Sequence, residues 1–179
     1  YKQLIERTFG IDVKYLFRKD KNYHQIRIYS RIVAQLFKQI FSENDKTLKG
    51  KVPAVVLMSS DKVLASFIAG FFDAEGYISK TRVALGINNK MIVRQLQFAL
   101  LRLGIVSSVS EYDNRKNPYS DKIRYTLAID DFEAVRRFQG LCNFISVEKQ
   151  EKLTKMIAGR SNRSFVRQIA VNGREVARI

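Results

Sequence analysis

The sequence has few of the residues on which covalent cross-links and metal centres depend. Its 179 residues include one cysteine, Cys142, one histidine, His24, two prolines and no tryptophan. A single cysteine excludes a disulfide framework, and one cysteine with one histidine cannot form a structural zinc site within one chain. No apolar run approaches the roughly 20 residues that a bilayer-spanning helix needs, so we expect no membrane span.

The chain also lacks a secretory signal at its start. It begins YKQLIER, inside an amphipathic pattern and without Met. A signal peptide would instead begin with a short basic region followed by an apolar one. We interpret this start as a cut or processed end, and we expect an intracellular protein.

Acidic residues are scarce relative to basic ones. The 32 Lys and Arg residues outnumber the 17 Asp and Glu residues, which gives a net charge of +15. Because 46% of residues are hydrophobic, we expect this charge on a folded body rather than on a disordered tail. Extended polyanions are the natural partners of such a surface. The length fits one ordinary domain or two small joined repeats.

Apolar residues recur with helical spacing in five segments and with a period of two in three others. The predicted helices are 30–41, 61–73, 89–103, 130–144 and 147–157, and the predicted strands are 24–29, 82–87 and 122–129. Ser30, Asn89 and Asp130 stand at the starts of three helices and are favourable N-cap residues. His24 and Cys142 fall at apolar positions, so we expect both in the core.

A unit of helix, hairpin and helix occurs twice in the chain. Residues 3–11 and 97–105 each contain a helix that stops at a glycine, Gly10 or Gly104, before a strand. Residues 61–88 precede the second copy and have no counterpart before the first. The pattern predicts the back half of a first repeat plus a linker in 1–60, a complete second repeat in 61–158, and a C-terminal extension in 159–179.

The most specific segment is 66–78, where two carboxylates stand at the expected end of a helix. Asp73 and Glu75 would face the negative end of the helix dipole, where Lys or Arg is favoured, and such local conflicts often mark a site. The small residues of this segment are Ser66, Ala69, Gly70 and Ala74. They would let a second helix pack closely along one face, which would bring two carboxylates together as ligands for a divalent metal.

This segment resembles the motif of the LAGLIDADG (DOD-type) homing endonucleases. The sequence IAGFFDAEG at 68–76 matches its nine letters in the Ala-Gly core, the apolar pair and the acid-small-acid-Gly ending. The family repeat is motif helix, hairpin, helix, hairpin, helix, and residues 61–157 follow that order. Residues 51–53, Lys-Val-Pro, are similar to the junction between repeats in single-chain members. The resemblance implies an α+β fold of αββαββα repeats with a curved antiparallel β-sheet saddle.

The resemblance also implies site-specific cleavage of double-stranded DNA, with the concave sheet face in the major groove and Mg²⁺ or Mn²⁺ at the cleavage centre. By its position in the motif, Glu75 is the catalytic acid that binds the metal. Ser66, Gly70, Asp73 and Ala74 would form the helix interface, in which Asp73 is a capping acid.

Basic residues that the family places near the cleavage centre would map to two places in this chain. They are Lys51 or Lys49 before Pro53, and Lys149 or Lys152 after the last hairpin; Lys51 and Lys149 are our candidates. Spacing alone does not choose among the four lysines.

The chain departs from the family in holding one motif, whereas paired active sites draw one acid from each of two. Three explanations are open. The first motif lies outside this sequence, two copies pair through the motif helix, or cleavage has been lost. Cleavage would be lost in a relative that binds nucleic acid without cutting it, such as an RNA-splicing maturase or a transcription regulator.

Polar and cationic side chains on the predicted strands are the candidates for DNA contact. They are Gln25, Arg27, Tyr29, Lys80, Arg82, Asn88, Lys122, Arg124 and Thr126. Arg and Lys could reach guanine or phosphate, and Gln25 and Asn88 could read adenine. The alternative is that these residues form only the solvated side of an antiparallel sheet.

Residues 168–178 predict a hairpin around Asn172-Gly173. This hairpin falls outside the repeat. It could be the return into a protein-splicing domain, as in intein-borne members of the family, or a terminal extension.

Overall fold

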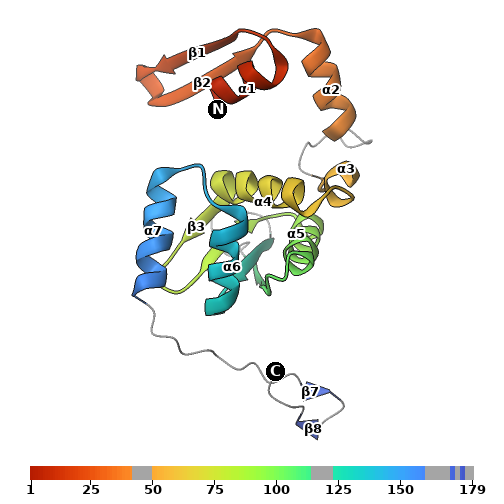
Figure 1. The fold of residues 1–179 in the computed structure, drawn as a ribbon, viewed down its shortest axis with the longest axis vertical. Coiled ribbons are helices and arrows are strands. Elements are labelled where there is room, and N and C mark those ends of the chain that lie inside the picture. The colour runs from red at the N-terminus through yellow and green to blue at the C-terminus, as the bar shows by residue number, and fades with distance from the viewer. Residues whose placement is uncertain (42–49, 114–122, 160–169, 172–173, 176–179) are drawn as a thin grey trace. The chain divides into compact units, whose positions relative to one another are not determined.

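The computed structural model describes residues 1–41, 50–113, 123–159, 170–171 and 174–175 (Figure 1). The chain divides into two compact units, Tyr1–Leu48 and Lys49–Ile179. Residues 50–60 therefore belong to the second unit, and the assignment of the units as repeats stays a prediction. No helix in the described ranges is long and apolar enough to cross a membrane.

The first unit is a helix, a hairpin and a helix, in the predicted order. Its elements are α1 (Lys2–Phe9), β1 (Val13–Arg18), the 3₁₀ turn η1 (Lys19–Lys21), β2 (Tyr23–Ile28) and α2 (Arg31–Phe41). Gly10 ends α1 with a φ of 62°, a left-handed conformation that favours glycine, and its N–H donates to the carbonyl of Glu6. The Glu6 carboxylate then accepts from the N–H of Val13, 3.1 Å away, which joins the helix to the first strand.

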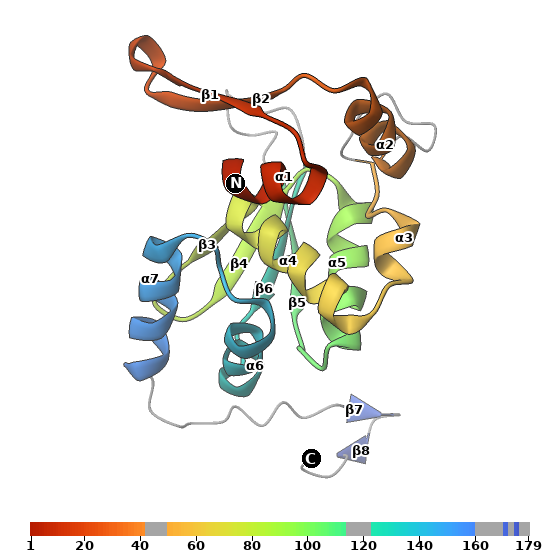
Figure 2. The same ribbon diagram turned by 45° about the horizontal axis from the view of Figure 1, so that its top comes forward.

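The second unit contains the complete αββαββα order that the resemblance implies. Its elements are α3 (Ala54–Leu57), α4 (Asp61–Glu75), β3 (Gly76–Ile78), β4 (Val83–Ile87), α5 (Lys90–Arg102), β5 (Ser108–Asp113), β6 (Ile123–Ile129), α6 (Phe132–Cys142) and α7 (Val147–Ala158). The antiparallel sheet has the strand order β3-β4-β6-β5. Figure 2 shows α4, α5 and α6 against one face of this sheet. The α+β fold class is confirmed.

The core of the second unit lies between the helices and the sheet. Alternate residues along the strands, such as Val83, Leu85 and Leu127, are fully buried against the helices. The Phe138 ring lies between Phe72 and Phe144, with ring centroids 5.0 Å and 5.5 Å away. This packing fixes α4 and α6 relative to each other and to the strands.

Two of the three predicted N-caps are confirmed. The Ser30 hydroxyl accepts from the N–H of Val33, and the Asn89 side chain accepts from the N–H of Ile92. The third prediction is wrong, because Asp131 rather than Asp130 caps α6, with its carboxylate 2.9 Å from the N–H of Ala134. Strand β6 continues to Ile129, so Asp130 directly follows the strand, and its side chain contacts residues of the sheet instead.

The predictions for the histidine and the cysteine have opposite outcomes. Cys142 is buried, and desolvation raises the pKa of its thiol to about 12. His24 is exposed, contrary to the prediction. It stacks against the rings of Tyr15 and Phe17, which are themselves exposed, although Val13 on the same strand face is buried.

The predicted C-terminal hairpin is present as two short strands. β7 (Ala170–Val171) and β8 (Arg174–Glu175) pair antiparallel, with Ala170 opposite Glu175 and Val171 opposite Arg174. This register leaves two residues for the connection, as the Asn-Gly pair predicts.

Candidate active site and nucleic-acid interface

Helix α4 has one buried face and one open face. Leu64, Ile68 and Phe72 lie in the core. On the other side Ser66 and Ala74 are exposed and Gly70 is half-buried. Among the described atoms outside the helix's own backbone, none would lie within 4 Å of a methyl group placed on Gly70. The predicted interface residues therefore form a smooth surface that a second helix could approach closely.

The end of α4 is set by Gly76. This residue is extended, with a φ of −88°, and a Cβ atom there would lie 2.5 Å from the carbonyl oxygen of Phe72. Glycine is required by this close approach rather than by backbone freedom. The helix consequently ends at Glu75, whose side chain is exposed, and the chain enters β3 at the next residue.

A lysine from α7 resolves the electrostatic conflict at this helix end. The Lys149 ammonium donates to the carbonyls of Phe72, Asp73 and Gly76 at 3.2, 2.5 and 2.8 Å. A cation at a helix C-terminus is favoured by the helix dipole and satisfies carbonyls that have no partner within the helix. The Asp73 carboxylate accepts from the N–H of Ser146, 3.1 Å away, directly before α7. The acid and the lysine thus connect α4 to α7.

The structure brings two of the three predicted catalytic residues to the same helix end. Glu75 is the last residue of α4, and Lys149 lies against its final carbonyls. Lys51 lies in a segment held against the start of α5, because the N–H of Val52 donates to Gln95 and the carbonyl of Gly50 accepts from Asn89.

The other two lysine candidates have different surroundings. Lys152 forms an ion pair with Glu148, 2.6 Å away on the same helix, and this pairing lowers the pKa of the Glu148 carboxyl. Lys49 lies outside the described residues.

The donors at the α4 end suit a hard divalent cation. Glu75 supplies an exposed carboxylate, and Mg²⁺ is commonly bound by one or two carboxylates with substrate phosphates and water. In the described part of the chain no group of three or more His, Cys, Asp or Glu side chains could hold a metal alone. A metal bound to Glu75 would therefore need ligands from DNA and from another acid.

The sheet face opposite the helices, which we call the outer face, carries the predicted strand residues of the second unit. By strand register this face contains Tyr77, Ala84, Gly86, Ser108, Ser110, Tyr112, Arg124, Thr126 and Ala128. Arg82, directly before β4, and Asp130, directly after β6, continue the same alternation and form an ion pair. Arg82, Arg124 and Thr126 thus share one surface, as predicted. Lys80 is exposed between β3 and β4, and Asn88 is exposed after β4. Lys122 lies outside the described residues.

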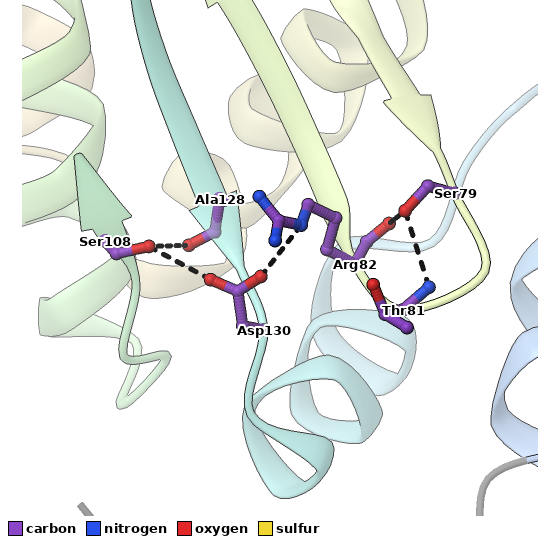
Figure 3. Close-up of polar contacts among 6 residues, drawn as sticks. All are labelled: Ser79, Thr81, Arg82, Ser108, Ala128 and Asp130. Carbon is purple, nitrogen blue, oxygen red and sulfur yellow. Dashed lines mark hydrogen bonds and ion pairs between the residues drawn. The ribbon is translucent and has the colours of Figure 1, made fainter. Parts of the chain in front are cut away.

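Arg82 belongs to a polar cluster that crosses the outer face. Figure 3 shows its Nε atom directed at Asp130, with 3.0 Å between Nε and Oδ1. The other carboxylate oxygen, Oδ2, accepts from the Ser108 hydroxyl, also at 3.0 Å. Sequence analysis missed Asp130 and Ser108 because they come together only through the strand order β4-β6-β5.

Arg124, the second arginine of the outer face, lies over Gly86 of the neighbouring strand. A Cβ atom on Gly86 would collide with the Arg124 guanidinium, at 2.8 Å from one terminal nitrogen and 3.0 Å from Cζ. The long side chain of Arg124 therefore lies flat over β4, where any larger residue would displace it. The period-two pattern placed Gly86 on this face but gave no sign of that contact.

In the first unit, the face of β1 and β2 that contains the predicted DNA-contact residues carries cations beside aromatic rings. Gln25 is half-buried, Arg27 and Tyr29 are exposed, and by register Lys14 lies opposite Arg27. The Lys14 ammonium is 5.6 Å from the centre of the Tyr29 ring. The Arg18 guanidinium lies over Tyr23, at 6.0 Å. Lys14 and Arg18 were missed by sequence analysis, although alternation in 13–18 could have placed them on this face.

Comparison with known proteins agrees with this geometry. Residues 62–143 match the LAGLIDADG-like domain, a range that includes α4, the sheet and α6. This part of the chain belongs to the LAGLIDADG family. The fold of this chain is similar to that of two solved structures. One is of mesophilic variants of the homing endonuclease I-DmoI, and the other is of I-DmoI in complex with DNA and Ca. Both superpose with a TM-score of 0.57 and 16% identity over 78% of this chain, and over 68% and 63% of the respective I-DmoI chains.

The relatives among curated proteins have unrelated names. From Methanocaldococcus jannaschii, glutamine–fructose-6-phosphate aminotransferase is 28% identical over 160 residues and the replication factor C small subunit is 26% identical over 158. Each alignment covers 88% of this chain but only 14% and 8% of the relative. The DNA helicase Hel308 of the same organism is 32% identical over 143 residues, 74% of this chain and 12% of the helicase.

Proposed function

We propose that the chain is part of a site-specific endonuclease that hydrolyses phosphodiester bonds in double-stranded DNA with a divalent metal. The observation that carries the proposal is the end of α4, where Glu75 is the last helical residue, with an exposed side chain, and the Lys149 ammonium binds the carbonyls of Asp73 and Gly76 on either side of it. The net charge of +15 and the polar outer face support a DNA partner. The I-DmoI complex with DNA and Ca supports the same partner and a divalent ion.

In this proposal Glu75 holds the metal, with Mg²⁺ or Mn²⁺ as the expected ion. A bound divalent ion supplies charge neutralisation at the scissile phosphate and a water of lowered pKa. Lys149 adds positive charge at the same helix end, where it would stabilise the negative charge that develops on the phosphate. The side chains of the outer face orient the duplex, and the expected products carry a 5′ phosphate and a 3′ hydroxyl.

The second acid would come from another motif helix packed on the open face of α4. Ser66, Gly70 and Ala74 are small enough for close contact, and nothing described lies over Gly70. The partner helix would be supplied by residues outside this sequence or by a second copy of the chain.

We further propose that the chain is carried inside host proteins as an intein-borne insert. An aminotransferase, a replication factor subunit and a helicase share no common activity, yet each matches this chain over a small part of its length. A mobile insert accounts for that distribution. The β7–β8 hairpin would then begin the return to a protein-splicing segment.

Cleavage of a plasmid that carries the uninterrupted host sequence tests the proposal. We expect a linear product with Mg²⁺ and none with EDTA. Glu75→Gln should bind the same duplex and cut at least a thousandfold more slowly, since it removes a charged metal ligand. Glu133→Gln, which alters an exposed acid on α6, is the matched control and should cut normally.

Two outcomes would contradict the proposed cleavage. Normal cutting by Glu75→Gln would show that the site is assigned wrongly. Salt-sensitive binding of the unaltered chain without any linear product, including in the presence of Mn²⁺, would indicate the non-cleaving class of relatives.

A further inference from the structure

We propose that Asp130 is a positioning residue that fixes Arg82 for reading a guanine in the major groove. The inference rests on the proposed DNA-binding function and concerns how one base pair is recognised. Its basis is the cluster in Figure 3, in which the Ser108 hydroxyl donates to Asp130 and Asp130 forms an ion pair with Arg82.

The contact between Asp130 and Arg82 uses a particular edge of the guanidinium. Asp130 Oδ1 lies 3.0 Å from Nε, the nitrogen nearest the stem of Arg82. The two terminal nitrogens form the fork with which arginine contacts O6 and N7 of guanine. A carboxylate 3.0 Å from Nε limits the positions that the guanidinium can take and therefore the directions of that fork.

Charge favours a base over a phosphate as the target of Arg82. The arginine and the aspartate together carry no net charge, and the side chain of Asp130 is only 26% exposed. A phosphate contact depends mainly on net positive charge, which this pair lacks. Hydrogen bonding to a base edge depends instead on the direction of the donors, which the pair provides.

Asp130 is itself held in place. Ser108 donates to Oδ2 from the neighbouring strand β5, and its hydroxyl also lies 3.4 Å from the carbonyl of Ala128. The cluster therefore spans three adjacent strands, β4, β6 and β5. Such a supporting contact reduces the side-chain entropy that Arg82 would lose on binding DNA.

A binding selection from a random duplex library, with the full chain in EDTA, tests the inference without requiring cleavage. Arg82→Ala should reduce the preference for guanine at one position by about tenfold to a hundredfold. Asp130→Asn should relax the same position by several-fold and should raise affinity for unrelated duplexes, because it removes a negative charge from the outer face. The double variant should show no further loss of preference.

Matched variants separate positioning from folding. Ser108→Ala removes only the support of Asp130 and should relax the same position more weakly than Asp130→Asn. Glu111→Gln removes a carboxylate of the same sheet that lies 3.9 Å from Lys90 on the side of the helices, and should leave the profile unchanged. Thermal unfolding of each variant checks that the fold is intact.

The inference is overturned if Asp130→Asn and Ser108→Ala leave the profile unchanged, or if Asp130→Asn relaxes a position that Arg82→Ala does not. Either result would mean that Asp130 does not act through Arg82. Failure of the unaltered chain to select any duplex would contradict the proposed DNA-binding function as well. If Arg82→Ala, Asp130→Asn and Ser108→Ala all keep the sequence preference of the unaltered chain, only the inference is contradicted.

Discussion

The segment from α1 to α2 and the segment from α5 to α6 have the same order of elements, but they hold their side chains differently. Both begin with a helix that ends at a glycine with positive φ, 62° at Gly10 and 72° at Gly104. In the second segment the strands lie in a four-stranded sheet with a buried side, whereas in the first they form a two-stranded hairpin. Equal local sequence signals therefore produce unequal burial.

The cations of the first-unit hairpin and of the four-stranded sheet also have different surroundings. In the hairpin, Lys14 lies beside the exposed ring of Tyr29, and Arg18 lies over Tyr23 and pairs with the exposed carboxylate of Asp20 at 3.0 Å. In the sheet, Arg82 is bound to Asp130, which Ser108 supports. Contacts with exposed rings leave a long side chain several orientations, while an ion pair supported from a neighbouring strand favours one. The comparison suggests that the sheet presents the more preorganised surface.

Substitutions in the two interiors should give the largest contrast. Phe138→Ala removes a fully buried ring and should lower the free energy of unfolding of the second unit by about 3–5 kcal/mol. Val33→Ala removes two methyl groups from one of the few buried side chains of the first unit and should cost about 1–2 kcal/mol. Amide exchange in urea, followed on peptides of each unit, measures both values. Leu141→Ala, at an exposed position of α6, is the control. Equal losses of unfolding free energy for Phe138→Ala and Val33→Ala would contradict the contrast between the two units.

The lysine at the end of α4 allows a second comparison of helix ends. Lys149→Met removes a donor shared by three carbonyls, of which that of Phe72 still accepts from the N–H of Gly76, and should lower the free energy of unfolding by about 1–3 kcal/mol. Lys155→Met alters an exposed lysine of the same helix and should stay within about 0.5 kcal/mol. Urea unfolding checks both, and a loss below that of Lys155→Met would show that the three contacts contribute nothing.

The paired glycines provide a direct test between equivalent positions. Gly10→Ala should cost about 1 kcal/mol from its positive φ alone, since no described atom lies within 4 Å of the new methyl group. Gly104→Ala should cost about 2 kcal/mol, because the methyl would also meet the Arg137 guanidinium, which donates to the carbonyl of Leu103. Thermal unfolding measures the difference. Gly140→Ala, within a helix and with open space around it, should not destabilise the chain.

The buried thiol gives an effect that is confined to alkaline pH. Because the folded pKa of Cys142 is raised to about 12, above the roughly 8.5 of an exposed thiol, the unfolded chain loses this proton first. The contribution of the thiol to stability is complete below about pH 8.5 and falls by up to about 1.4 kcal/mol per pH unit above it. Thermal unfolding at pH 7 and pH 10 should show that the unaltered chain loses more stability between these two pH values than Cys142→Ala does. Parallel losses in both proteins would contradict this assignment.

Local signals predicted the elements well but not the contacts between them. Period and cap residues placed α2, α5 and α7 close to their observed bounds. Two adjacent aspartates were equally good caps for α6, and the length of β6 decided between Asp130 and Asp131. The period-two rule put His24 on an apolar face. Val13 on that face is buried, but around His24 the face is exposed.

The candidate site was predictable only where one segment of chain contains it. The motif gave Glu75 and the open face of α4, and spacing gave Lys149 as one of four lysines. The bonds from Lys149 to the end of α4 join residues more than 70 positions apart, and no periodicity reports such contacts. The same holds for Asp130, whose partners lie on other strands.

Gly86 has a consequence for how this surface could diverge. It contributes no side chain, yet the space that it leaves determines where the Arg124 guanidinium lies. A single codon change to alanine would redirect a cation while leaving the charge of the sheet, and every residue able to touch a nucleotide, as they were. Variation in a recognised sequence can thus begin at a position that itself makes no contact.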